Sequence, residues 1–332
     1  MTIRMPAEWE PHDWLWIGFP WNPQEWGGNG TLMRAQDQLI AFADAVRAGG
    51  RGEEVRVVCT DLPSAIIAKA LIKSDAKIVT ERLGDVWLRD TGPIAVEQTD
   101  GSLALADFGF NGWGGKYEMP GDEDVGARLA AATGLPTTSV PLIFEGGAVD
   151  TDGTGLFVTT QQCLLNPNRN PDLNAKQIET LLAGSLGLTD MLWLGDGLVN
   201  DHTDGHVDNL ARFVAPGVIA IPEATSADDP NAAIYADATA RARAHGLTVA
   251  SMPSPGKVVV DGEIVPASYM NFLIANATVI VPVYGVPNDD AAVQALAAFF
   301  PGRDIIPLPS DALLAGGGSF HCSSQQMPSV RA

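Results

Sequence analysis

The sequence predicts a mixed α/β chain that folds as one domain over residues 1–332 and closes like a propeller around a central site. Strand-like and helix-like segments alternate along all 332 residues, and no linker rich in Pro, Gly or Ser divides them. Clusters of polar residues recur at steps of 55, 61, 63 and 53 residues, at Asp90, Glu145, His206, the Tyr269–Asn271 pair and Cys322. This spacing fits structural modules that each deliver one residue to a common centre.

Short apolar or β-branched runs predict the strands, in the order Val55–Cys59, Ile94–Glu97, Ser102–Phe108, Leu156–Thr160, Ala211–Ile221, Leu247–Met252 and Ala277–Val283. Between them, helical spacing of apolar residues predicts helices at Met33–Ala48, Asp124–Thr133, Leu173–Leu186, Asn231–His245 and Asp289–Phe300. The last helix opens with two aspartates, which suit a helix N-terminus.

The composition argues against two classes of protein. The net charge of -20 and the pI of about 4.4 are wrong for a nucleic-acid-binding surface, which needs a basic face. No run of about 18 apolar residues exists, so we expect no membrane span. The N-terminus has no apolar signal region, and we expect a cytoplasmic protein. An acidic surface can steer a cationic substrate, but the simpler interpretation is solubility.

Three cysteines, Cys59, Cys163 and Cys322, are too few and odd in number for a disulfide framework. We expect Cys59 and Cys163 to be buried and inert. Cys322 lies in the densest motif of the chain, Gly316–Gln326, where three glycines precede the thiol. A nucleophilic cysteine needs its pKa lowered by its surroundings. Taken alone, the motif slightly favours a buried structural thiol in a glycine loop.

The histidine next to that cysteine is not the expected base. Adjacent residues on an extended strand point to opposite faces, so His321 would face away from the side of Cys322. A second motif, HTDGHVDN, supplies His202, His206 and Asp208. If Gly205–Asn209 is extended, His206 and Asp208 share a face and form an acid/base pair. A metal site and an Asp/Gly turn remain open alternatives.

Two further carboxylates stand at breaks in the pattern. Asp90 lies in WLRDTGP, where turn chemistry alone explains an aspartate. Glu145 lies in FEGG, at a strand end or facing a pocket. Together with Cys322 and His206, these carboxylates suit a planar cation, because paired carboxylates match the donor fork of a guanidinium. A bound cation would also favour the thiolate of the cysteine.

The ordered motifs WEPHDWLWIGFP, WLRDTGP, FNGWGG, FEGG, TTQQCLLNPNRNP, DHTDGHVDN, PASYMNFLIAN and GGGSFHCSSQQMP extend over Met5–Pro328. Together they resemble the agmatine deiminase and bacterial peptidyl-arginine deiminase family. The resemblance implies the pentein fold, an α/β propeller of five ββαβ-type modules around a pseudo-fivefold axis. It also implies hydrolysis of agmatine to N-carbamoylputrescine and ammonia, with no metal or organic cofactor.

By this resemblance, Cys322 attacks the guanidine carbon and forms a thiouronium-type intermediate. His206 protonates the departing ammonia and then activates water. Asp90 and Asp208 hold the guanidinium nitrogens, and Glu145 orients or charge-balances His206. Two tryptophans, Trp87 and Trp113, are candidates for packing along the aliphatic arm, and a core role is about equally favoured for both.

Some features depart from the family pattern. The segment after FNGWGG is short, and Ser323 and Ser324 replace a more usual hydrophobic–threonine pair after the cysteine. These changes bear on which substrate tail is accepted. Arg169 in NPNRNP could bind a carboxylate, but a structural role is favoured, because agmatine enzymes with a similar motif bind no carboxylate.

Three alternatives stay open. The same chemistry could act on free arginine or peptidyl-arginine. A metal-dependent amidinohydrolase built on His202 and His206 would instead release urea. A non-catalytic pentein would bind a protein partner. In the favoured interpretation the partner is a small cationic guanidine, and the family precedent implies a homo-oligomer.

Overall fold

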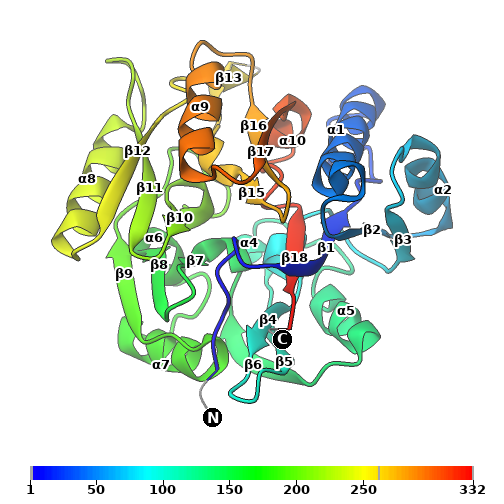
Figure 1. The fold of residues 1–332 in the computed structure, drawn as a ribbon, viewed down its shortest axis with the longest axis horizontal. Helices are drawn as coiled ribbons and strands as arrows, with labels where there is room; N and C mark the ends of the chain where they lie inside the picture. The colour runs from blue at the N-terminus through cyan, green and yellow to red at the C-terminus, as the bar shows by residue number, and fades with distance from the viewer. Residues whose placement is uncertain (1–2, 261, 331–332) are drawn as a thin grey trace.

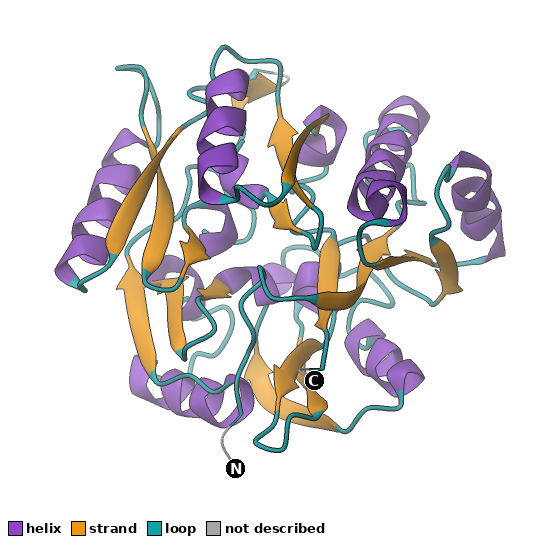
Figure 2. Cartoon of the chain, in the orientation of Figure 1, coloured by secondary structure: helices purple, strands orange, loops and turns teal. Residues whose placement is uncertain are grey.

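The computed structural model describes residues 3–260 and 262–330, and its chain alternates between helices and strands (Figure 2). Five of the sheets in these residues share one arrangement of strands. In each, two strands pair antiparallel, and a third strand then pairs parallel with the second strand of that pair. Antiparallel neighbours need only a tight turn, whereas a parallel neighbour needs a crossover, here made by a helix.

The first of these sheets joins the two ends of the chain. Its strands lie in the order β18 (Ser324–Pro328), β1 (His12–Gly18), β2 (Glu54–Cys59) and β3 (Lys77–Thr80). The others follow along the chain as β4 (Ile94–Glu97), β5 (Leu103–Gly109) and β6 (Thr137–Ile143), then β7 (Val149–Thr151), β8 (Leu156–Thr160) and β9 (Asp190–Leu194), then β10 (Arg212–Ala215), β11 (Val218–Glu223) and β12 (Thr248–Pro253), and finally β15 (Leu273–Ile274), β16 (Thr278–Val283) and β17 (Asp304–Pro309). A separate hairpin pairs β13 (Val259–Val260) with β14 (Glu263–Ile264).

The crossover helices lie around the outside of the molecule, with the strands nearer its centre (Figure 1). They are α1 (Asn29–Arg47), α2 (Leu62–Leu71), α5 (Val125–Thr133), α7 (Ala175–Leu186), α8 (Ala232–Ala244) and α9 (Asp289–Phe299). Four short helices lie in the connections: α3 (Leu88–Thr91), α4 (Gly112–Gly115), α6 (Gln161–Leu164) and α10 (Asp311–Ala315).

Helix α7 shows how the local sequence sets these elements. Its Asn174 and Gln177 form a capping box in which each side chain accepts the other residue's backbone N–H. The helix buries Ile178, Leu182 and Leu186, one turn apart on a single face, against the sheets. It stops at Gly187, which takes the left-handed conformation that favours glycine.

All five predicted helices are present, and six of the seven predicted strands match a single observed strand. The predicted strand Ala211–Ile221 is wrong as one element, because it is a hairpin of β10 and β11 that turns at Gly217, where φ is 68°. The extended conformation considered for Gly205–Asn209 is also wrong, since Val207–Asn209 forms a 3-10 turn. The α/β class is confirmed, and the closure of five modules about one axis stays a prediction.

Candidate active site

Cys322 lies in a turn directly before β18, and its side chain is buried. The Asn271 amide brackets this residue, because its Nδ2 donates to Sγ at 3.0 Å and its Oδ1 accepts the Cys322 backbone N–H at 3.3 Å. The thiol lies 3.5 Å from Oδ2 of Asp208, in position to donate to it. The sulfur is thus held in one place and aimed at a carboxylate.

The surroundings of Cys322 disfavour a thiolate. Burial raises the pKa of Cys322 well above its ordinary value, and the negative charges of Asp208 and Asp90 raise it further. The raised pKa favours the protonated thiol. A cation placed between these carboxylates would reverse this electrostatic effect.

Two carboxylates flank the thiol with different partners. Asp90, on α3, accepts the backbone N–H of Gly147 and the indole N–H of Trp113, each at 3.0 Å, yet burial still raises its pKa to about 6. Oδ2 of Asp208 lies 2.7 Å from Nδ1 of His321. Burial raises the pKa of Asp208, but the contact with His321 and the positive charges of His206 and Arg212 together outweigh burial and lower the pKa overall. Oδ1 of Asp208 is buried and has no hydrogen-bond partner among the described residues.

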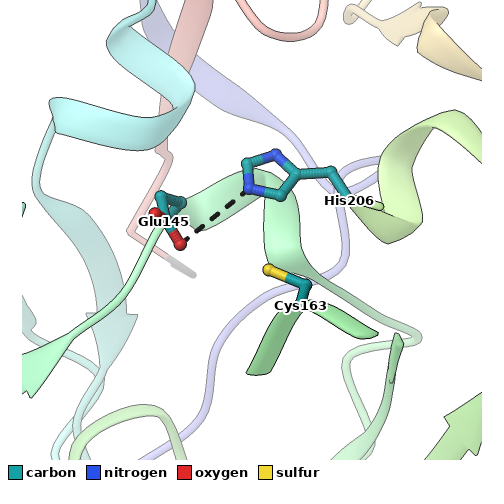
Figure 3. A group of neighbouring side chains, drawn as sticks. All are labelled: Glu145, Cys163 and His206. Carbon is teal, nitrogen blue, oxygen red and sulfur yellow. Dashed lines mark ion pairs between the residues drawn. The ribbon is translucent and has the colours of Figure 1, made fainter. Parts of the chain in front are cut away.

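His206 lies between two acids. Its Nδ1 is 3.6 Å from Oδ1 of Asp90, and its Nε2 is 3.9 Å from Oε2 of Glu145 (Figure 3). Burial lowers the pKa of His206, but the negative charge of Asp90 and the contact with Cys163 outweigh burial and hold the pKa well above the ordinary value. The raised pKa favours the imidazolium, which is able to give up a proton.

Glu145 is fixed from its other side. Its Oε1 accepts from Nε of Arg169 at 2.9 Å, while its Oε2 faces His206 without a hydrogen bond. Burial raises the pKa of Glu145, but His206 and Arg169 outweigh it and lower the pKa. The carboxylate thus stays ionised beside the imidazolium.

Gly147 marks the point where these groups converge. A Cβ atom there would lie 2.6 Å from Nδ1 of His206, 2.9 Å from Oδ1 of Asp90 and 3.1 Å from Oδ2 of Asp208. No side chain fits at Gly147 without displacing them. The structure therefore brings together four of the residues that the sequence selected, and Cys322 joins them through Asp208.

The cavity over these groups is lined by Trp87, Trp113, Asp90 and Cys322, whereas His206, Asp208 and Glu145 lie beneath its wall. Its described lining residues also include Glu25 and Asp85, but no lysine or arginine. Trp87 stacks on Trp26 with ring centroids 5.9 Å apart. Trp87 and Trp113 both belong to the hydrophobic core as well as to the cavity wall.

Sequence reasoning missed a buried ion network beneath the site. Both ring nitrogens of His321 are engaged, Nδ1 with Asp208 and Nε2 with Oε2 of Glu8 at 2.8 Å. Glu8 and Asp150 pair with Arg212, whose side chain is fully buried. His321 thus supports Asp208 and is not free to act as a base. Only two features of the sequence pointed to these supporting residues. Glu8 directly precedes the WEPHDW motif, and Asn271 belongs to one of the regularly spaced polar clusters.

Three other sequence predictions have clear outcomes. Cys59 and Cys163 are buried, as expected, but Cys163 lies beside His206 and Glu145 and is not remote from the site. Arg169 is buried and ion-paired with Glu145 and Asp204, which agrees with a structural role.

His202 does not join His206. It is exposed, and its Nδ1 lies 2.7 Å from the hydroxyl of Tyr117. The metal site suggested for the two histidines is therefore absent from the described part of the chain. A search of the same residues for a helix long and apolar enough to cross a membrane finds none.

The sequence matches the family described as Porphyromonas-type peptidyl-arginine deiminase over residues 4–328. A Yersinia pseudotuberculosis protein named as a candidate agmatine deiminase is 36% identical, over 98% of this chain and 95% of its own length. The solved agmatine deiminase of Enterococcus faecalis has a TM-score of 0.91 at 30% identity, over 99% of this chain and 97% of its own. A cysteine-to-serine variant of the C. jejuni agmatine deiminase, solved with substrate bound, has a TM-score of 0.89 at 27% identity, over 99% of this chain and 97% of its own.

The fold is shared more widely. An amidinotransferase from Microseira wollei has a TM-score of 0.60 at 14% identity and covers 99% of both chains. At that identity the likeness concerns the fold alone.

Proposed function

This chain belongs to the Porphyromonas-type peptidyl-arginine deiminase family, and from that premise we propose that it hydrolyses agmatine to N-carbamoylputrescine and ammonia. The reaction makes it a hydrolase of the C–N bonds of linear amidines. The observation that carries the proposal is the buried group of one thiol, one imidazolium and three carboxylates, which matches a guanidinium in charge and hydrogen bonding.

The first half of the reaction forms a covalent intermediate. A guanidinium held by Asp90 and Asp208 lowers the pKa of the Cys322 thiol, which loses its proton to Asp208 or to solvent. The thiolate attacks the guanidine carbon and forms a tetrahedral adduct. His206 gives its proton to the departing nitrogen, the C–N bond breaks, and ammonia leaves a thiouronium on Cys322.

The second half releases the product. The neutral imidazole of His206 takes a proton from water, which attacks the thiouronium carbon. The second adduct expels the sulfur of Cys322, which takes up the hydroxyl proton of the adduct and is restored as a thiol, leaving the ureido product and the imidazolium. Glu145 keeps the imidazole oriented and charge-balanced through both steps. The side chains used in these steps lie close together, because the distances from Cys322 to Asp208 and from His206 to Asp90 and Glu145 are all under 4 Å.

The cavity lining favours an amine tail over a carboxylate tail. Asp85 and Glu25 lie along its wall, and Asp85 is buried with its pKa raised to about 7, chiefly by burial. An ammonium group would pair with these acids, whereas the carboxylate of free arginine would be repelled. Arg169, the arginine considered for binding a carboxylate, is already paired with acids.

Substrate profiling tests this specificity. Wild type should turn over agmatine with a much higher kcat/KM than free arginine or an N-acyl-arginine amide. Asp85→Asn keeps the acceptor for the indole N–H of Trp26, at 3.1 Å, and removes only the charge. We expect it to raise KM for agmatine by about tenfold with little change in kcat.

The matched control is Asp228→Asn, at an exposed aspartate, which should leave both constants unchanged. If the protein instead prefers peptidyl-arginine or free arginine, the proposed reaction stands but agmatine is not the substrate. Release of urea in place of the ureido product would overturn the proposal.

Three broader proposals accompany this function. Residues 1–332 form one catalytic domain, and the repeated strand order supports five modules around a pseudo-fivefold axis. The three free, buried cysteines fit a reducing, cytoplasmic environment. Assembly into a homo-oligomer stays a prediction, which sedimentation or light scattering would test.

A further inference from the structure

Glu145, Cys163 and His206 form a cluster (Figure 3). Glu145 lies near Nε2 of the imidazole, whereas Nδ1 faces Asp90. One donor atom from each lies within 4.8 Å of the other two, and all three residues are fully buried. They come from separate parts of the chain: Glu145 follows β6, Cys163 lies on α6, and His206 precedes a 3-10 turn. The proposed deiminase reaction uses two of them and leaves the thiol without a role.

Two donor atoms in this cluster face each other as an ion pair at 3.9 Å but make no hydrogen bond. Oε2 of Glu145 and Nε2 of His206 are buried and make no hydrogen bond with any described residue. A buried polar atom without a hydrogen bond costs free energy, so an ion pair too long for a hydrogen bond indicates a ligand or a functional strain. The thiol of Cys163 adds a soft donor to the same space.

Each donor is also supported from behind. Nδ1 of His206, the nitrogen that faces away from the cluster, lies 3.6 Å from Oδ1 of Asp90 as an ion pair without a hydrogen bond. Oε1 of Glu145 is held by Nε of Arg169 at 2.9 Å. The backbone N–H of Cys163 donates to the Thr160 hydroxyl, which caps the short helix α6. Metal-binding histidines and carboxylates are oriented by such outer partners.

We propose that Glu145, Cys163 and His206 form an inhibitory binding site for a thiophilic divalent cation of the Zn²⁺ class. One thiolate, one imidazole and one carboxylate oxygen are zinc ligands, and a single oxygen donor does not suit Mg²⁺ or Ca²⁺. In a tetrahedral site two nitrogen or oxygen ligands lie about 3.4 Å apart. The Nε2–Oε2 distance of 3.9 Å therefore needs only a small closure.

Binding exchanges protons for metal. The thiol of Cys163 releases one proton to solvent and the imidazolium of His206 releases another, while Glu145 is already ionised. The fourth ligand position would hold water. Because the cluster is buried, the cation must enter through local opening, and inhibition should develop with time.

Inhibition itself rests on the proposed function, since a metal on Nε2 prevents His206 from moving protons. The guanidinium-binding Asp90 and Asp208 stay free. Zn²⁺ should therefore lower kcat without a matching rise in KM. Metal binding can be measured without turnover, so failure of this inference and failure of the proposed function are distinguishable.

The experiment titrates the purified protein with Co²⁺ as a spectroscopic probe and with Zn²⁺ in competition. Wild type should bind one Co²⁺ with thiolate-to-metal charge-transfer absorption, and Zn²⁺ should displace it. Cys163→Ser, which conserves volume, should lose that absorption and raise the Kd by at least about 100-fold. If that variant fails to fold, Cys163→Ala replaces it.

Two cysteine variants control for the other thiols. Cys322→Ala lacks the nucleophile and Cys59→Ser changes a buried cysteine outside the cluster, so both should bind Co²⁺ like wild type. In the activity assay, zinc sensitivity should disappear with Cys163→Ser. The inference is overturned if wild type binds no Co²⁺ through sulfur, or if binding is lost in Cys322→Ala and kept in Cys163→Ser.

Discussion

Replacing Gly147 by alanine adds one methyl group at the point where the proposed catalytic groups converge. The new Cβ would lie 2.6 Å from Nδ1 of His206, where ordinary contact begins at 3.4 Å, so the imidazole must withdraw by about 0.8 Å. Oδ1 of Asp90, at 2.9 Å, must withdraw by about 0.5 Å. The φ angle of Gly147 is not positive, so alanine brings no backbone strain of its own.

These displacements set the expected magnitude. A misplacement of about 1 Å at a reacting centre costs about 10²-fold in rate, or about 2.7 kcal/mol of transition-state stabilisation. Overpacking of a filled interior costs a further 1–3 kcal/mol of folding stability, roughly. We therefore expect Gly147→Ala to fold, with a lower free energy of unfolding and kcat/KM reduced by about 10²-fold.

The assay follows ammonia and ureido product from agmatine, with stability measured by urea denaturation. The matched control is Gly184→Ala, an exposed glycine within α7 whose Cβ would meet nothing within 4 Å. That variant should keep wild-type kinetics and gain up to about 1 kcal/mol from helix propensity. Wild-type kcat/KM in a folded Gly147→Ala protein would refute the assignment of this point as the reaction centre.

Three further predictions follow from the same geometry. With the pKa of Asp90 raised to about 6, kcat/KM for agmatine should fall about tenfold per unit as the pH drops below 6, because the protonated acid no longer pairs with a guanidinium; a flat profile from pH 7 to 5 would contradict this. The raised pKa of Cys322 predicts that a cationic haloacetamidine labels it faster than neutral iodoacetamide at pH 8, as mass spectrometry can show, and equal rates would contradict the electrostatic account. Arg212→Leu removes the buried cation that Glu8 and Asp150 share, although Glu8 keeps its contact with His321, and should cost about 3–5 kcal/mol in urea denaturation. A loss under 1 kcal/mol would show that the pairing is dispensable.

Eight of the eighteen strands and five of the ten helices in the described residues overlap a predicted element, in segments where apolar periodicity is strong. Helices α7 and α9 and strands β4 and β8 were predicted within two residues at each end. Strand β18 was missed because its sequence, SQQMP, is polar although it is buried beside the site. An apolar pattern reveals a buried strand only when the buried residues are apolar, so a buried strand of polar residues gives no such signal.

The site was partly predictable for a related reason. Cys322, His206, Asp90 and Glu145 stood out because their residue types are chemically unusual beside glycines, and the structure places them together. The extended conformation considered for His206 was wrong, since a tight turn there gives no periodic signal.

The ion pairs of Glu8 with Arg212 and His321 could not be predicted at all. They join residues separated by about 200 and 300 positions, and pairing across such distances leaves no mark on local sequence. The closeness of Cys163 to His206 escaped prediction for the same reason.

The central claim is that Cys322 carries a covalent intermediate, and trapping that intermediate tests it most directly. Wild-type protein is mixed with agmatine, quenched in acid within the first turnover and digested for mass spectrometry. The account predicts that the Cys322 peptide gains the mass of agmatine less one ammonia, and that Cys322→Ala shows neither adduct nor ureido product. Turnover with no adduct on Cys322, or ureido product formed by Cys322→Ala at the wild-type rate, would contradict it.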